Sequence, residues 1–232
     1  VCSSDLKPLF QLHYGTGEER FSLLPPGVNR DRLAEVDKQE CREEVRKELG
    51  LGQHDHMLLM VGSGFITKGL DRALIAIAAL PATIKDKTRL CVIGEDNPRP
   101  FVKMVSKLGL VDNVTILRGR EDVPRFLAAA DLLVHPAYQE NTGTVLLEAL
   151  VMGLPVVATG ICGYAQYIEE AGAGTVLAEP FDQQSFNQVV MNMLTSTERE
   201  AWERNGVAFG EWADIYSMPD RAADLICQRV SR

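Results

Sequence analysis

Two carboxylates, Glu140 and Glu148, flank a short polar loop that leads into an apolar run, and seven residues separate them. The loop begins at Asn141, and the run after it predicts a helix whose first N–H groups have no partner within the helix. These N–H groups belong to Gly143, Thr144 and Val145. Because they lie at the positive end of the helix dipole, they predict an anion site that suits a phosphate group.

Glu148 would lie one turn into this helix, among aliphatic residues. A buried carboxylate is costly unless it is hydrogen-bonded, and a ribose diol offers two donors. Helix capping explains Glu148 poorly, because a capping-box Glu lies three residues after a Ser or Thr, whereas Glu148 is four after Thr144 and six after Thr142. Glu140, which precedes the helix, is predicted to accept hydrogen bonds from a sugar ring held beyond the phosphates.

A second candidate loop runs from Gly62 to Gly69 and contains Thr67 and Lys68. Thr67 occupies the place of the third glycine of a dinucleotide fingerprint, so the glycines alone are a weak signal. Lys68 is more informative, because a cation where a helix begins opposes the helix dipole unless an anion binds there. We predict a phosphate contact for Lys68; a solvated surface lysine is the alternative.

Two further side chains follow predicted strands. Arg120 has a planar guanidinium that could stack on a base or bind phosphate. Pairing with Glu121 or Asp122 is an equally good interpretation. His135 ends a strand, where a lone histidine is more often structural than a catalytic base. The sequence shows neither a Ser-His-Asp set nor a cluster of metal ligands.

Short aliphatic runs alternate with amphipathic segments, which is typical of a parallel sheet built from βαβ units. We predict strands at residues 57–61, 89–93, 114–117, 132–135, 155–158 and 174–177. We predict helices at 39–49, 70–80, 100–108, 123–130, 144–152, 164–171, 183–194, 198–209 and 219–232. The expected fold is an α/β, doubly wound, six-stranded sheet, with its ligand crevice at the carboxyl ends of the strands.

The two ends of the chain lack the alternation of strands and helices that marks this core. Residues 1–20 look weakly helical and linker-like, and 21–24 read as a short strand stopped by Pro25 and Pro26. In the tail, Gly210 and Pro219 are expected to separate the helices. The last helix carries an apolar stripe that calls for a partner.

Composition narrows the class of protein. The chain has 232 residues, a net charge of −8 and a pI near 5.1, which argues against nucleic acid or a polybasic membrane patch. Its five cysteines form no C-x-x-C pair, which fits a reducing compartment such as the cytoplasm. No apolar run approaches the roughly 18 residues of a membrane span. Because the chain begins at Val1, we expect it to be a fragment.

These motifs resemble the retaining glycosyltransferases of the GT-B class, family four, whose hallmark is E-x7-E. The likeness covers roughly residues 20–232. Its other motifs are Leu23-Leu-Pro-Pro-Gly27-Val, Val61-Gly-Ser, Lys68-Gly69, Val92-Ile-Gly94 and His135-Pro136. Three further segments are similar to the lipopolysaccharide core glucosyltransferases of that family: the run from Ala128 to Glu140, Cys162-Gly-Tyr-Ala and Glu179-Pro-Phe181.

The resemblance implies transfer of glucose from UDP-glucose to a heptose of the lipopolysaccharide inner core, in the cytoplasm at the inner face of the inner membrane. It implies that Lys68 neutralises the diphosphate, Glu148 holds the ribose, Glu140 holds the donor sugar and Arg120 lies near the uracil. Arg32 would approach the nucleotide, with Thr67 and Asn141 beside the donor. No cofactor or metal is expected, because cationic side chains and a helix terminus stabilise the departing UDP.

Two departures from the family pattern matter. The family usually has Arg before the lysine, where this chain has Thr67, and a lost charged donor would cost about 1.5–3 kcal/mol. The resemblance also implies an acceptor-binding N-terminal half outside this chain, so we expect a remnant or linker at 1–20, a nucleotide-sugar domain at 21–210 and a crossover helix at 211–232. The alternatives are a GT-B nucleotide-sugar epimerase and a UDP-binding module without transfer activity.

Overall fold

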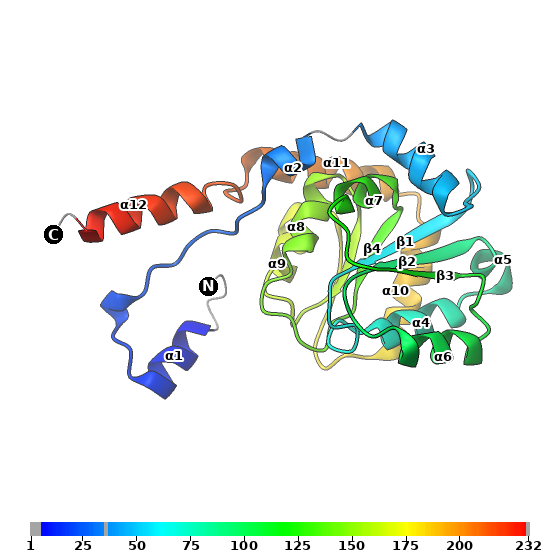
Figure 1. Cartoon of the computed structure of the whole chain (residues 1–232), viewed down its shortest axis with the longest axis horizontal. Helices are drawn as coiled ribbons and strands as arrows, with labels where there is room; N and C mark the ends of the chain where they lie inside the picture. The colour runs from blue at the N-terminus through cyan, green and yellow to red at the C-terminus, as the bar shows by residue number, and fades with distance from the viewer. Residues whose placement is uncertain (1–5, 35–36, 231–232) are drawn as a thin grey trace.

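The computed structural model describes residues 6–34 and 37–230, and its centre is a six-stranded parallel sheet (Figure 1). Neighbouring strands follow the order β3-β2-β1-β4-β5-β6. The strands are β1 His56–Val61, β2 Thr88–Ile93, β3 Val114–Leu117, β4 Leu132–His135, β5 Val156–Thr159 and β6 Gly174–Leu177. The doubly wound sheet is therefore confirmed, and each of its six predicted strands lies within one residue of its expected bounds.

Helices cover both faces of the sheet, which explains why the strands are apolar without alternation. One face packs against α3 Lys38–Glu48, α7 Val123–Ala129, α8 Thr144–Val151, α9 Ala165–Ala171 and α11 Arg199–Trp212. The other face packs against α4 Leu70–Ala78, α6 Arg99–Lys107 and α10 Gln183–Thr195, with the short α5 Ala82–Lys85 at its margin. Both hydrophobic cores are thus completed within this part of the chain.

The strand order changes direction between β1 and β4, where Leu58 pairs with Leu132 and Leu59 with Leu133. The chain leaves β1 toward β2 on one side and leaves β4 toward β5 on the other. Loops that follow the two strands therefore meet at a topological switch point, the usual place for a ligand crevice in this fold. The two candidate loops of the sequence are these loops.

A buried ionic cluster ties the opposite edge together. Asp131, just before β4, is 5% exposed and contacts three arginines, Arg42, Arg46 and Arg199. Its Oδ2 also accepts a hydrogen bond of 2.7 Å from the amide of Met57 in β1. The cluster joins α3 and α11 to the sheet. Burial raises the pKa of Asp131, but the positive charges of the arginines and the hydrogen bond from Met57 outweigh it and hold the pKa below its ordinary value.

The N-terminal segment differs from its prediction. Residues 21–24 form no strand, because they run along the surface without a partner strand; Leu23 is 70% exposed. The two prolines that follow lack N–H donors, and the chain next makes a backbone bond from Val28 N to Ile215 O at 2.8 Å. The preceding stretch is more regular than a linker. It holds α1 Leu6–Tyr14 and a 3₁₀ turn at Glu18–Arg20, and the unpredicted helix α2 spans Arg30–Ala34.

Gly210 does not break the tail, because α11 continues through it to Trp212. A Cβ at Gly210 would lie 2.8 Å from Cγ1 of Val151, and one at Gly206 would lie 2.5 Å from the carbonyl oxygen of Leu150. Both glycines therefore let α11 pack closely on α8. Pro219, in contrast, does mark a break between helices: it lies in the first turn of α12 Met218–Val230, where its missing N–H costs nothing.

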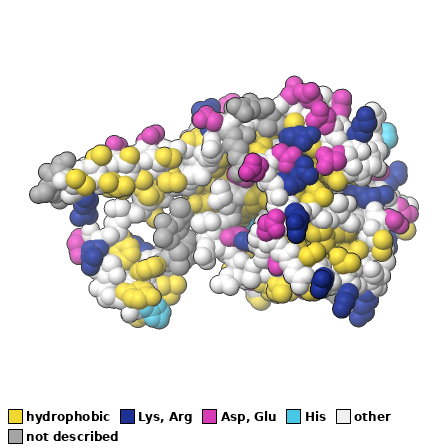
Figure 2. Space-filling view, viewed as in Figure 1, with side chains coloured by type: hydrophobic (Ala, Val, Ile, Leu, Met, Phe, Trp, Pro, Cys, Tyr) yellow, Lys and Arg dark blue, Asp and Glu magenta, His cyan; other side chains and the backbone are white. Residues whose placement is uncertain are grey.

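Helix α12 projects from the sheet domain on the same side as α1 (Figure 1). Figure 2 shows apolar side chains along it; Ile226 is 64% and Val230 82% exposed. The predicted apolar stripe is thus present, and α12 buries no residue within the described part of the chain. Among the described helices, none has the length and apolar character required to cross a bilayer.

Candidate functional site

The loops after β1 and β4 bring three of the singled-out side chains into contact. The ammonium of Lys68 forms an ion pair and hydrogen bond with Oε2 of Glu140. His135 Nε2 lies 3.1 Å from the same oxygen. The structure therefore joins a cation, a carboxylate and an imidazole at the switch point, a contact that the sequence did not predict.

Glu140 is ionised in this cluster. Burial opposes its ionisation, yet the hydrogen bonds of His135 and Lys68 outweigh burial and lower its pKa from 4.5 to about 2. The side chains of Lys68 and Glu140 are only 19% and 11% exposed, so water screens their attraction little. The positive charge of Lys68 is thus neutralised by Glu140 before any ligand binds.

Backbone contacts fix the two loops against each other. Gly69 has φ 75°, and a Cβ there would lie 2.0 Å from the carbonyl oxygen of Pro136, so only glycine permits this approach. The carbonyl of Thr67 accepts hydrogen bonds from the amides of Tyr138 at 2.8 Å and Gln139 at 3.2 Å. The side chain of Thr67 is exposed and donates to the carbonyl of Gly64 within its own loop.

The structure places a helix N-terminus where the anion site is predicted, and anion binding there stays a prediction. Helix α8 begins at Thr144 after Gly143, which adopts φ 84° and provides no side-chain cap. The first amides, those of Gly143, Thr144 and Val145, therefore lie at an uncapped helix N-terminus. A Cβ at Gly143 would lie 3.4 Å from Cγ of Glu140, so this terminus is beside the ionic cluster. Asn141 is exposed at its rim, with its carbonyl against Gly163.

Glu148 lies one turn into α8 and is partly buried between the buried residues Leu147 and Ala149. The N-cap residue of α8 is Gly143, so no side chain caps the helix from that position. The carboxylate thus belongs to the helix that provides the anion site. Its predicted hydrogen bonds to a ribose stay a prediction.

Arg120 pairs with its sequence neighbour Asp122, as the alternative interpretation has it. Two hydrogen bonds join them, Nε to Oδ1 at 2.7 Å and Nη2 to Oδ2 at 2.8 Å. The contact from Arg120 lowers the pKa of Asp122 to about 2, and the guanidinium lies 4.7 Å from the centre of the Phe126 ring. A nucleotide contact of Arg120 remains a prediction. Arg32 belongs to α2, but its side chain lies outside the described residues.

Sequence reasoning missed Arg72, in the first turn of α4. Its guanidinium lies between two aromatic rings, 3.5 Å from the centre of Tyr138 and 3.6 Å from that of Phe181. It also donates to the carbonyls of Pro136 and Ala137. No local pattern announces this contact, because the three elements involved are far apart in the chain.

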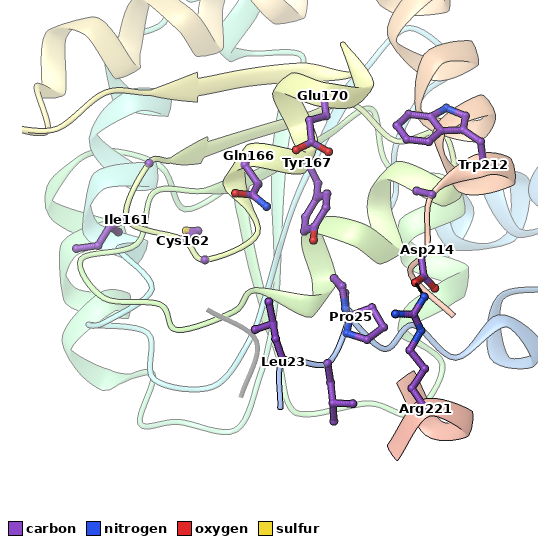
Figure 3. A pocket seen from close by; sticks show the side chains of 15 residues that line it. Leu23, Pro25, Ile161, Cys162, Gln166, Tyr167, Glu170, Trp212, Asp214 and Arg221 are labelled. Atoms are coloured by element: carbon purple, nitrogen blue, oxygen red, sulfur yellow. Dashed lines mark hydrogen bonds and ion pairs between the residues drawn. The ribbon is translucent and has the colours of Figure 1, made fainter. Parts of the chain in front are cut away.

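A separate cavity of about 600 Å³ lies next to the loop that follows β5 (Figure 3). Its polar and aromatic lining comes from Gln166, Tyr167, Glu170, Trp212, Asp214 and Arg221. Leu23 and Pro25 of the N-terminal segment face this lining. The cavity does not include the Lys68–Glu140 pair, but its Gly163 contacts the loop that carries Asn141.

Comparison with known families identifies the class of protein to which this fold and its paired loops belong. Residues 41–208 match the family described as "Glycosyl transferases group 1", and the chain belongs to this family. It is similar to the lipopolysaccharide glucosyltransferase WaaG of Escherichia coli K12, with 47% identity over 94% of this chain and 58% of the relative. A D-inositol 3-phosphate glycosyltransferase of Segniliparus rotundus is 29% identical over 84% of this chain and 44% of the relative.

Solved structures confirm the fold. The crystal structure of WaaG, a glycosyltransferase involved in lipopolysaccharide biosynthesis, superposes with a TM-score of 0.93 and 46% identity, covering 97% of this chain and 61% of that one. Anabaena HepE, solved in complex with UDP-glucose, gives a TM-score of 0.83 at 20% identity, covering 98% and 63%. The predicted GT-B relationship is therefore confirmed. The chain spans about half the length of the curated relatives it matches.

Proposed function

We propose that this chain is the donor-binding part of a retaining hexosyltransferase that moves glucose from UDP-glucose to a heptose of the lipopolysaccharide inner core. The observation that carries the proposal is the Lys68–Glu140 pair beside the uncapped N-terminus of α8. A cation and a row of amides converge there, as a diphosphate requires, and a carboxylate lies next to them, as sugar hydroxyls require.

Each group has a distinct task in this proposal. Lys68 leaves Glu140 to bind the diphosphate, and with the α8 amides it stabilises the negative charge that develops on UDP as the glycosidic bond breaks. Glu148 accepts hydrogen bonds from the two ribose hydroxyls, while Glu140 accepts hydrogen bonds from hydroxyls of the glucosyl group. Lys68 and the α8 amides thus stabilise the negative charge of the leaving group without a bridging ion, and we propose that neither a metal nor a cofactor takes part.

The identity of donor and acceptor is supported by the 47% identity to WaaG, whose name specifies lipopolysaccharide and glucose. The acceptor would be bound by the part of such an enzyme that this chain does not span. We propose that residues 1–20 and α12 adjoin that part and that 21–210 form the donor domain. The exposed stripe of α12 fits such a contact. The enzyme would work in the cytoplasm, at most peripherally on the inner membrane.

Isothermal titration calorimetry with UDP and UDP-glucose tests the donor site. We expect the wild-type chain to bind both ligands, Lys68→Ala to weaken both by about tenfold or more, and Glu148→Ala to weaken both equally. Lys103→Ala and Glu200→Ala, which change exposed residues on α6 and α11, are the matched controls and should leave both affinities unchanged. A folded wild-type chain that binds no UDP would refute the proposal.

A transfer assay then tests the activity itself. The chain is joined to, or mixed with, the complementary part of a WaaG-type enzyme and given UDP-glucose and a heptose-containing core acceptor. Retention predicts an α-linked product from the α-linked donor, detected by the anomeric proton coupling. Formation of an epimer of UDP-glucose without transfer would instead identify an epimerase.

A further inference from the structure

We propose that Arg72 is a positioning residue that sets the placement of Glu140 toward the donor sugar, an inference that rests on the proposed function. Among the described residues, the hydrogen bonds and ring contacts of Arg72 involve neither Glu140 nor Lys68; they hold the segment Pro136–Tyr138 that leads to Glu140. The proposal assigns to this side chain a part in sugar selectivity rather than in nucleotide binding.

The guanidinium of Arg72 contacts the loop in two ways, by stacking on aromatic rings and by donating hydrogen bonds. Its faces stack on Tyr138, from the β4 loop, and on Phe181, from the loop between β6 and α10, at 3.5 and 3.6 Å. Its Nη1 donates to the carbonyl of Pro136 at 3.1 Å and to that of Ala137 at 2.9 Å. A planar cation with fixed donors can do both, whereas an ammonium cannot.

Neighbouring contacts complete the clamp on this loop. The hydroxyl of Tyr138 donates to Oδ2 of Asp71 at 2.7 Å, and that of Thr159 donates to the carbonyl of Ala137 at 2.9 Å. The backbone carbonyl of Arg72 in turn accepts a hydrogen bond of 3.1 Å from the side-chain amide Nε2 of Gln183, on α10. Arg72 is thus the junction of α4, the β4 loop and the start of α10.

The contacts of Arg72 end at Tyr138, two residues before Glu140. Beyond Gln139, Glu140 is held by Lys68, His135 and, at 3.4 Å, the amide of Thr142. In the proposed function a donor diphosphate takes Lys68 away from this set. The direction of the carboxylate then depends more on the backbone that enters Glu140, and Arg72 fixes that backbone.

The test compares UDP with UDP-glucose in calorimetric titrations of wild type, Arg72→Lys and Phe181→Leu. We expect Arg72→Lys to weaken UDP-glucose about tenfold while changing UDP less than about twofold. Phe181→Leu, which removes one stacking face, should act in the same direction and carries the test if Arg72→Lys does not fold. The matched control is Arg89→Lys, because Arg89 Nη1 also donates to two backbone carbonyls but lies at the start of β2.

Hydrogen exchange supplies a readout without ligand. In Arg72→Lys the amides of Tyr138 and Gln139 should exchange at least about fivefold faster than in wild type, with Arg89→Lys unchanged there. Equal losses of UDP and UDP-glucose affinity would show a general structural role, and unchanged exchange would show that Arg72 does not hold this backbone; either result would overturn the inference. Wild type that binds UDP while Arg72→Lys keeps the affinity ratio refutes this inference alone; wild type that binds no UDP refutes the proposed function and this inference together.

Discussion

Replacing Glu140 with Gln removes the negative charge that neutralises Lys68 while keeping the size of the side chain. A diphosphate that binds Lys68 in the wild-type chain must first compete with this carboxylate and then bear its repulsion. The substitution therefore has opposite effects on two ligands. UDP, which lacks the sugar, should bind more tightly to Glu140→Gln, whereas UDP-glucose loses its strongest proposed sugar acceptor.

The magnitude follows from the ionisation of Glu140. The pKa of Glu140 falls from its ordinary value of 4.5 to about 2. Because a shift of one pKa unit corresponds to about 1.4 kcal/mol, the interactions that favour the ionised carboxylate outweigh the cost of its burial by about 3 kcal/mol. His135 and Lys68 share this sum. Because Lys68 is only one of the two partners, its pairing contributes on the order of 1 kcal/mol, and releasing it tightens UDP about fivefold.

Calorimetry at pH 7.5 measures both ligands on wild type, Glu140→Gln and the control Glu203→Gln. Glu203 is also an ion-paired carboxylate, with Nε of Arg199 at 3.1 Å, but lies on α11 away from the two loops. UDP should bind about fivefold more tightly and UDP-glucose no more tightly than to wild type, with the control unchanged. Weaker UDP binding by Glu140→Gln would refute the idea that Glu140 competes with the diphosphate.

The pH dependence provides a second check with a defined sign. A folded-state pKa below the ordinary value means that Glu140 contributes stability above pH 4.5 and loses it as pH falls toward 2. Between pH 6.5 and 8 the carboxylate stays ionised. The gain in UDP affinity of Glu140→Gln should therefore be the same at both pH values, and a gain that vanishes at pH 6.5 would point to another titrating group.

Three further predictions concern stability and metal. Asp131→Asn leaves the three arginines around it without their shared carboxylate and should lower the free energy of unfolding in urea by about 3 kcal/mol. The pKa of Asp131 is lowered in the folded state, so this contribution should be lost in acid. The free energies of unfolding of wild type and variant should therefore converge as pH falls below 4. Gly69→Ala should cost about 2 kcal/mol or more in thermal unfolding, since its Cβ meets Pro136, while Gly109→Ala, at a positive φ in open space, should cost less. EDTA should leave UDP affinity within about twofold; a larger loss, restored by Mg²⁺, would contradict metal-independent binding.

The central strands β1, β2, β4 and β5 were predictable because they are buried on both faces and so appear as nearly uninterrupted aliphatic runs. The errors fall where burial is not the deciding factor. Residues 21–24 have a strand-like composition but no strand beside them. Gly210 resembles a helix stop, yet it lies inside α11 because α8 passes too close for a Cβ. Tertiary packing, which a single segment does not encode, decided both.

The candidate site was predictable to the level of loops. Lys68 and Glu140 follow the carboxyl ends of strands, so the fold places both at the same edge. That they touch depends on β1 and β4 being neighbours in register, and on Gly69 letting the two loops meet at Pro136. The stack on Arg72 was beyond prediction, because it needs the β6–α10 loop to arrive on the far side of the guanidinium.

Under the proposed function, the Lys68–Glu140 pair favours binding of the donor UDP-glucose over binding of the product UDP. With UDP-glucose bound, sugar hydroxyls satisfy the carboxylate while Lys68 serves the diphosphate. Once the glucosyl group has left, Glu140 faces the diphosphate with no hydroxyl to bind, and re-forming its pair with Lys68 competes with UDP. The same carboxylate thus favours the intact donor and disfavours the spent one, an asymmetry that a lysine without an acidic partner could not provide.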